Sequence, residues 1–134
     1  MKNNMSIMVT GGNGLVGSTL DSNLRFGSEF DLRNPTTCDE LFQKEKPVNV
    51  IHCAARVGGL GGNMNMKGEF FYDNIMMGVQ LLHEAKNASV EKFVAQGTVC
   101  SYPKFGQIPF TEDMIWDGYP EETNAPYGLA KKML

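Results

Sequence analysis

The hydrophobic residues of the chain form short apolar runs separated by segments of helical periodicity. The runs "SIMVT", "VNVIHCAA" and "EKFVAQGT" are rich in β-branched residues and favour buried strands. Between the second and third runs, Phe71, Ile75, Val79 and Leu82 recur at helical intervals. They predict a long helix over residues 68–87. Strands that alternate with helices predict an α/β fold with a parallel sheet, which binds ligands at the carboxyl ends of its strands.

Three further helices are expected from start and stop signals. "LVGSTLDSNL" can begin a helix after the first glycine cluster, and "TTCDELFQKEKP" has Thr36 or Thr37 as a candidate N-cap and Pro47 as a stop. "NAPYGLAKKML" offers Asn124 as a cap and Pro126 in the first turn. "VGGLGGN" and the proline-containing residues 102–123 are expected to be loops. No linker interrupts the pattern, so we expect one domain over residues 1–134.

Composition narrows the classes of function. A chain of 134 residues, 42% hydrophobic and 20% charged, suits one globular domain, and a net charge of -3 offers no basic surface for nucleic acid or an anionic membrane. Its three cysteines lack CxxC spacing, which argues against a disulfide framework or a metal site and favours the cytoplasm. No signal peptide or long apolar span is present, so we expect no membrane association.

Gly11, Gly14 and Gly17 form GxxGxxG directly after the first predicted strand. Such a loop presents main-chain amides to a pyrophosphate, although the same glycines also suit an ordinary strand-to-helix turn. Asp31 stands twenty residues after Gly11, where a dinucleotide site places the acidic residue that binds ribose. The 14 residues from Gly17 to Asp31 leave little room for a full helix and a complete second strand.

Tyr127 and Lys131 would lie one helical turn apart, where an ammonium lowers the pKa of a phenol and makes it a proton-transfer group. A surface Tyr stacked on a Lys stem is the alternative. Thr98 follows the third strand and could hydrogen-bond a reacting oxygen beside Tyr127, or simply end the strand. Cys100 could move a carbon-bound proton, or fill buried space.

The glycine loop, "HCAARVGG", "GTVCSYPK" and "NAPYGLAKKML" occur in one order. Together they resemble the extended short-chain dehydrogenase/reductase superfamily, and within it the GDP-L-fucose synthase family. The resemblance covers nearly the whole chain. It implies a Rossmann-like parallel sheet flanked by helices and an NADP-dependent epimerase-reductase acting on GDP-4-keto-6-deoxy-mannose. The alternatives are another nucleotide-sugar epimerase or dehydratase of the same fold, or a non-catalytic dinucleotide- or partner-binding module.

The resemblance also implies roles for individual residues. Tyr127 matches the acid/base, Thr98 the hydroxyl beside it, Lys131 the residue that binds the nicotinamide ribose, and Cys100 the epimerisation cysteine. The residues that match the family's cofactor site are Gly11, Gly12, Asn13, Gly14, Leu15, Val16, Gly17, Asp31, Leu32, Ala54, Ala55, Gly97, Thr98 and Lys131.

Two departures from the family pattern bear on function. The interval before "DLRNP" is about ten residues shorter than in relatives, which shortens the second strand and leaves NAD as an alternative to NADP. Arg25 and Arg33 are the candidate phosphate partners. The family's epimerisation histidine and its substrate-binding region would follow Leu134, so the chain is expected to be a truncated form with impaired turnover. A homodimer or a partner chain is expected to cover the exposed sheet edge.

Overall fold

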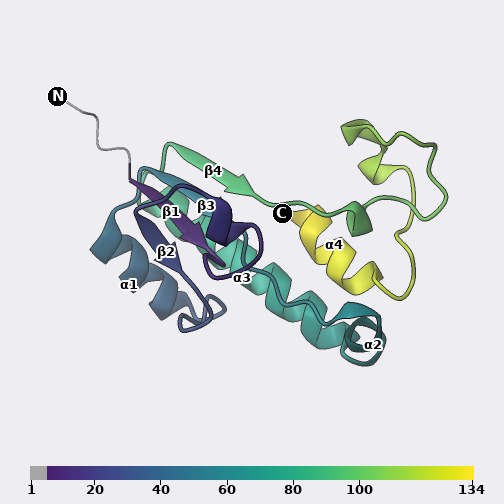
Figure 1. Ribbon diagram of the computed structural model, residues 1–134, viewed down its shortest axis with the longest axis horizontal. Helices are drawn as coiled ribbons and strands as arrows, with labels where there is room; N and C mark the ends of the chain where they lie inside the picture. Colours follow the sequence, from purple (N-terminus) through teal and green to yellow (C-terminus); the bar gives the residue numbers. More distant parts are fainter. Residues whose placement is uncertain (1–5) are drawn as a thin grey trace. The chain divides into compact units, whose positions relative to one another are not determined.

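The computed structural model describes residues 6–134 (Figure 1). The chain divides into two compact units. The first comprises the chain as far as Ala55 together with residues 76–96, and the second comprises residues 56–75 and 97–134. The single domain that the sequence predicts over residues 1–134 stays a prediction, and each unit is described here by itself.

Within residues 6–134, four parallel strands form one sheet, and all four belong to the first unit. Its strands are β1 (Ile7–Thr10), β2 (Leu24–Phe26), β3 (Asn49–His52) and β4 (Lys92–Ala95), in the order β2-β1-β3-β4. The sequence analysis therefore predicted the fold correctly, including the strands of all three apolar runs. β2 has three residues where the others have four, which agrees with the expected shortening.

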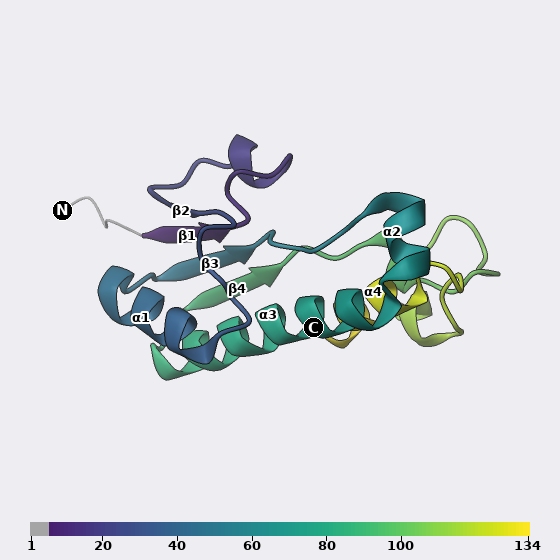
Figure 2. The same ribbon diagram turned by 90° about the horizontal axis from the view of Figure 1, so that it is seen from below.

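The strand order determines which face each connection covers. The connections from β2 to β3 and from β3 to β4 run in the same direction across the sheet, and they contain α1 (Pro35–Glu45) and α3 (Lys67–Asn87). Right-handed crossovers in one direction lie on one face, so α1 and the carboxyl-terminal part of α3 share a face (Figure 2). The connection from β1 to β2 runs in the opposite direction and lies on the other face.

The core of the first unit lies between the sheet and these two helices. Met8 of β1 and Val50 of β3 are paired in register, and both are fully buried. Phe93 of β4 is paired with Val50 and continues the same row of side chains across the sheet. They pack with a cluster from β2, the following loop and the helices: Phe26, Leu32, Cys38, Leu41, Phe42, Leu81 and Ala85. The alternate row crosses Val9, Ile51 and Val94 on the opposite face, where Val94 is 42% exposed. The helices therefore bury one face of the sheet more completely than the other.

The helix expected from "LVGSTLDSNL" is wrong. The segment forms only a single 3-10 turn, η1 (Gly17–Thr19), before the chain becomes extended at Leu20. Leu15 and Val16 are exposed, so the segment has no apolar face that packing could stabilise as a longer helix. The shortened β1–β2 connection thus loses its helix and keeps its strand.

The second predicted helix exists, but its N-cap is Asn34 and not Thr36 or Thr37. Asn34 Oδ1 accepts a hydrogen bond from the Thr36 amide at 2.9 Å, and Pro35 occupies the first turn. The helix ends where Lys46 adopts a left-handed conformation with φ of 46°, and Pro47 follows. The long third helix is confirmed at Lys67–Asn87.

The second unit contains α2 (Gly59–Asn65), the first part of α3, η2 (Val99–Ser101), η3 (Glu112–Trp116) and α4 (Ala125–Met133). The expectation of a loop at "VGGLGGN" is therefore wrong, because most of this segment forms α2. Gly58 and Gly62 lie against the buried Phe70 ring, where a Cβ would stand 2.8 and 3.2 Å from that ring. Burial of Phe70 on these glycines compensates for their weak helix propensity.

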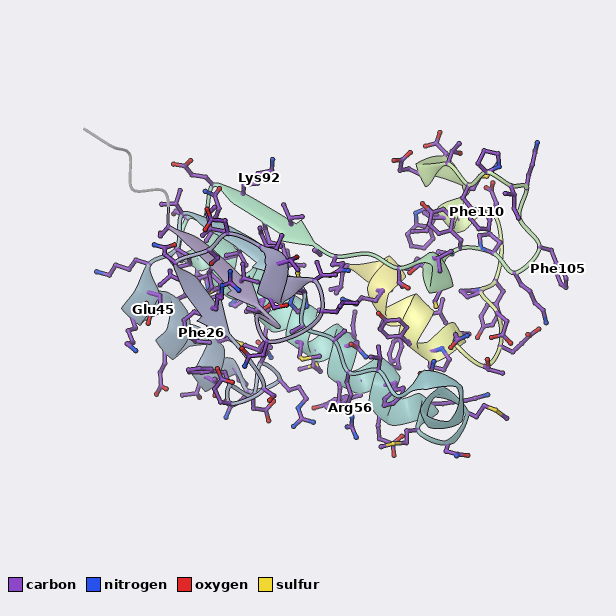
Figure 3. The ribbon with its side chains drawn as sticks, in the orientation of Figure 1. Phe26, Glu45, Arg56, Lys92, Phe105 and Phe110 are labelled. Atoms are coloured by element: carbon purple, nitrogen blue, oxygen red, sulfur yellow. The ribbon has the colours of Figure 1, made fainter. Side chains whose placement is uncertain are left out.

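The long segment before α4 is largely irregular, as expected, apart from η3. Phe105 is 91% exposed and projects from it, while Phe110 stacks on Tyr102 with ring centroids 4.8 Å apart (Figure 3). Asn124 is at the N-cap of α4, but its side chain makes no capping bond. The Glu121 carboxylate instead accepts the amide hydrogens of Thr123 and Asn124 at 3.1 and 3.3 Å.

Candidate functional site

The glycine loop joins β1 to η1 and is shaped by two close approaches. Gly11 has φ of +71°, and a Cβ there would stand 2.5 Å from the Ala54 nitrogen at the end of β3. A Cβ on Gly17 would overlap the Gly11 carbonyl oxygen. Only glycine fits at these two positions, so steric contacts require two of the three glycines in the GxxGxxG pattern.

Main-chain groups of this loop are suited to an anion. Within the described part of the chain, the amides of Asn13, Leu15 and Val16 donate no hydrogen bond, and all three residues are exposed. The Gly14 amide is used internally, on the Gly11 oxygen at 2.9 Å, and the Gly12 amide donates to the Phe26 oxygen at 2.9 Å. The loop is thus anchored to β1 and β2, while three of its amides remain able to bind a phosphate.

The main chain of Ala54, which follows β3, lies against Gly11. Ala55 is the next residue and also belongs to the first unit. Leu32 is 3% exposed and belongs to the core, so only its main chain can border a ligand. Their roles in cofactor binding stay predictions.

Both candidate phosphate partners are occupied by other groups. Arg25 Nη1 donates to the Ser18 oxygen at 2.8 Å, and Nη2 donates to the Leu20 oxygen. Arg33 forms a two-pronged ion pair with Asp31, at 2.8 and 2.9 Å, and this pair lowers the pKa of Asp31. Arg25 therefore holds the β1–β2 connection in place, and Asp31 is already bonded to a cation.

In the second unit, the structure brings Thr98, Cys100 and Tyr127 together. Thr98 Oγ1 accepts the Cys100 amide hydrogen at 3.2 Å and caps η2. Thr98 and Cys100 both act electrostatically on the Tyr127 phenol. Their roles as one catalytic group with Tyr127 stay predictions.

The pKa of Tyr127 is raised above its ordinary value, mainly because the side chain is half-buried. The hydrogen bond from Thr98 lowers it in part, and the nearby Cys100 thiolate would raise it further. The predicted lowering of the Tyr127 pKa by Lys131 is therefore wrong for this conformation. Lys131 is buried, at 8% exposure, one turn further along α4. Its catalytic and ribose-binding roles stay predictions.

Gly128 and Ser101 are two positions that the sequence analysis missed. A Cβ on Gly128 would overlap the Cys100 carbonyl oxygen, so the absence of a side chain allows α4 to approach η2. The buried Ser101 hydroxyl donates to the Gly128 oxygen at 2.9 Å. These contacts hold Tyr127 beside Thr98. The glycine after the tyrosine of "PYGLAK" was the available signal. Gly97, by contrast, has open space around it.

In residues 6–134, no helix is both long and apolar enough to cross a membrane. No group of three or more metal-binding side chains occurs in the same range.

A parallel sheet with a glycine-shaped loop after its first strand defines a Rossmann-type nucleotide-binding fold. The model of the NAD dependent epimerase/dehydratase family matches residues 7–134. The chain belongs to this family.

Several relatives are enzymes of GDP-sugar metabolism by name. The chain is 36% identical to the GDP-L-fucose synthase of Dictyostelium discoideum over 96% of its own length and 44% of the relative's. It is 35% identical to the GDP-L-colitose synthase of Yersinia pseudotuberculosis, over 95% and 44% of the two chains. A GDP-L-fucose synthetase from Naegleria fowleri solved with bound NADP superimposes with a TM-score of 0.86 at 34% identity, covering 99% and 43%. The chain thus spans less than half the length of these relatives, and it resembles GDP-L-fucose synthases as predicted.

Proposed function

We propose that the chain contributes the dinucleotide-binding and proton-transfer parts of a GDP-L-fucose synthase-like enzyme that reduces a GDP-4-keto-6-deoxyhexose. The observation that carries the proposal is the packing of α4 on η2, where a Cβ on Gly128 would overlap the Cys100 carbonyl oxygen, so that Tyr127 lies beside the segment of Thr98 and Cys100. The likeness to GDP-L-fucose and GDP-L-colitose synthases supports the substrate class.

The glycine loop fits a nicotinamide dinucleotide, either NADP or NAD. Gly11 and Gly17 leave no room for side chains, and three exposed amides between them can donate to the pyrophosphate. The NADP bound to the Naegleria relative supports this assignment. When bound, the reduced nicotinamide would supply a hydride to the sugar carbonyl.

The raised pKa of Tyr127 suits this direction of reaction. Reduction of a ketone needs a proton at the carbonyl oxygen, and a phenol whose pKa is raised holds its proton at neutral pH. Tyr127 would donate that proton, while the Thr98 hydroxyl orients the same oxygen and stabilises the phenolate that remains. Binding of a cationic nicotinamide or movement of Lys131 would then favour the ionised form.

Cys100 is the proposed group for moving a carbon-bound proton during epimerisation. Cys100 lies in η2, on which the start of α4 packs at Gly128, and this supports contact with the same sugar ring.

A second candidate is a dinucleotide-binding module that does not turn over substrate. The observation that favours it is the glycine loop, because phosphate binding needs only its main-chain amides. A further alternative is another nucleotide-sugar epimerase or dehydratase of the family. The β4 edge, with Lys92 and an exposed Val94, is the proposed contact for a second copy or a partner chain.

The test combines calorimetry with a kinetic assay on the full chain. Wild type and Tyr127→Phe are titrated with NADPH and NADH, and both are then assayed for NADPH oxidation with GDP-4-keto-6-deoxymannose. Tyr72→Phe is the matched control, because Tyr72 is a 57% exposed tyrosine of α3. We expect all three proteins to bind the dinucleotide and only Tyr127→Phe to lose oxidation. Binding without oxidation by wild type would favour the second candidate, and no binding by folded protein would contradict both.

A further inference from the structure

The glycine loop contains a chemically reactive pair, Asn13 followed by Gly14. It is the one Asn-Gly pair in the sequence. In such a pair the main-chain nitrogen of the glycine can attack the carboxamide carbon of the asparagine, because glycine has no side chain that blocks the approach. Asn13 and Gly14 are both exposed, so water reaches the pair. The loop therefore has the residues and the solvent that asparagine deamidation requires.

One hydrogen bond holds the nitrogen that would react. The Gly14 amide donates to the Gly11 oxygen at 2.9 Å, and Gly11 is itself fixed by its φ of +71° and its close contact with Ala54. The Gly14 nitrogen must lose its proton before it attacks, so this bond has to open first. Exposed loops open locally at a lower free energy than the core. The reaction rate should therefore follow the opening of the glycine loop.

A carboxylate already lies beside the Asn13 side chain. Glu29 Oε1 accepts the Gly27 amide hydrogen at 2.8 Å, and this bond lowers the pKa of Glu29, which keeps the group charged at neutral pH. Glu29 Oε2 lies 2.6 Å from the position that a Cβ on Gly27 would take, and Asn13 Nδ2 lies closer still to that position. The two side chains are thus neighbours. A carboxylate at residue 13 would face a like charge there.

We propose that Asn13 is a site of spontaneous deamidation that ends anion binding by the glycine loop, and that a bound dinucleotide protects it. The inference rests on the proposed dinucleotide site. The Gly14 nitrogen gives up its proton and bonds to Asn13 Cγ, while the Cγ–Nδ2 bond breaks and Nδ2 takes up a proton and leaves as ammonia. Water then opens the cyclic imide and gives an aspartate or an isoaspartate.

Both products change the loop in the same direction. Each places a new negative charge among the exposed amides that would bind a pyrophosphate, where it repels the ligand. Isoaspartate also lengthens the backbone between Gly12 and Gly14. A pyrophosphate that is already bound would instead hold the loop closed and keep the Gly14 nitrogen on Gly11. Deamidation then requires a chain without ligand.

The test follows the mass of the peptides of the full chain during incubation at mildly alkaline pH, with and without NADPH. Peptide fragmentation locates each conversion of an amide to an acid. Asn87 is the internal reference, because it is exposed and is followed by alanine. We expect Asn13 to react faster than Asn87. NADPH at about ten times its Kd should slow the reaction of Asn13 about tenfold, because few chains remain unliganded, and should leave Asn87 unchanged.

Calorimetry on the incubated protein then measures the loss of function. The fraction of chains that bind NADPH should fall by the fraction modified at Asn13. Asn13→Gln retains a carboxamide but places its carbon one bond further from the Gly14 nitrogen, which slows ring closure. Incubation should therefore not reduce the NADPH binding that this variant has when fresh. If Asn13→Gln is unfolded by circular dichroism, wild type incubated with NADPH and then dialysed is the control.

Each alternative result contradicts a separate part of the proposal. Reaction of Asn13 no faster than Asn87 in folded wild type would overturn the assignment of the site. Modified protein that binds NADPH as tightly as fresh protein would overturn its effect on the loop, and an unchanged rate with bound NADPH would overturn the protection. If fresh folded protein does not bind NADPH, the proposed dinucleotide function itself is wrong, and the mass spectra still decide whether Asn13 is the site.

Discussion

Gly128 and Cys100 meet where the backbone of α4 lies against the carbonyl of η2, and a Cβ on Gly128 would overlap the Cys100 oxygen. This contact, together with the hydrogen bond from Ser101 to Gly128, holds the start of α4 against η2, whose N-cap is Thr98. The absence of a side chain at Gly128 therefore allows the segment of the proposed proton donor, Tyr127, to pack beside that of Thr98.

Gly128→Ala should destabilise the protein by about 1–3 kcal/mol, because the added methyl group forces the two backbones apart. Chemical denaturation measures the change. Gly68→Ala is the matched control on α3, where a Cβ meets no atom within 4 Å, and it should be neutral or stabilise by up to about 1 kcal/mol. Equal stability of the two variants would contradict the close approach.

Alkaline titration should reveal the raised pKa of Tyr127. A group whose pKa is raised by folding stabilises the protein below its unfolded value, near 10, and this stabilisation is lost as pH rises through the folded value. Stability should therefore fall above about pH 10, and Tyr127→Phe should remove that part of the fall. Thermal melting against pH gives the measurement, with Tyr72→Phe as control. Thr98→Val should raise the Tyr127 pKa further, which the ultraviolet absorbance of the phenolate would report.

Arg25→Ala should cost about 1–2 kcal/mol of stability, because it removes charge-assisted hydrogen bonds to the Ser18 and Leu20 oxygens. Arg33→Ala removes an exposed pair with Asp31 and should cost less than about 1 kcal/mol. Urea denaturation compares the two. A larger loss for Arg33→Ala would mean that Arg25 does not hold the β1–β2 connection.

Val50→Ala and Val94→Ala compare the two faces of the sheet. Val50 is fully buried against the helices, so its truncation should cost about 2 kcal/mol. Val94 is 42% exposed on the adjacent strand, so its truncation should cost less than about 0.5 kcal/mol. The midpoint of urea unfolding would report both. Similar losses would indicate that a second chain covers Val94 in solution.

Sequence patterns predicted the strands and the long helix. The strands that α1 and α3 cover consist of consecutive apolar residues. Such runs can be recognised in the sequence, as in "SIMVT" and "VNVIHCAA". Thr98 and Tyr127 lie near the starts of η2 and α4, which pack together at Gly128.

The errors arose where tertiary contacts override local signals. Glycines in "VGGLGGN" indicated a loop, but the Phe70 ring packs on them and stabilises α2. "LVGSTLDSNL" lacked the partner surface that a helix needs. Arg25 donates to a main-chain oxygen, and Glu29 accepts the Gly27 amide hydrogen. Both contacts depend on the direction of the side chain, which spacing along the chain does not encode.

The brief β1–β2 crossover has a use in protein engineering. Ser22 donates a hydrogen bond to the Ile7 oxygen at 2.6 Å and Asn23 accepts one from the Ile7 amide at 3.2 Å, and only the short η1 lies between the two strands. Residues inserted just before Ser22 would lie on the face of the sheet that carries Ile51 and Val94. The apolar side of an amphipathic insert could pack on that face, so this loop is a suitable place to attach a new module.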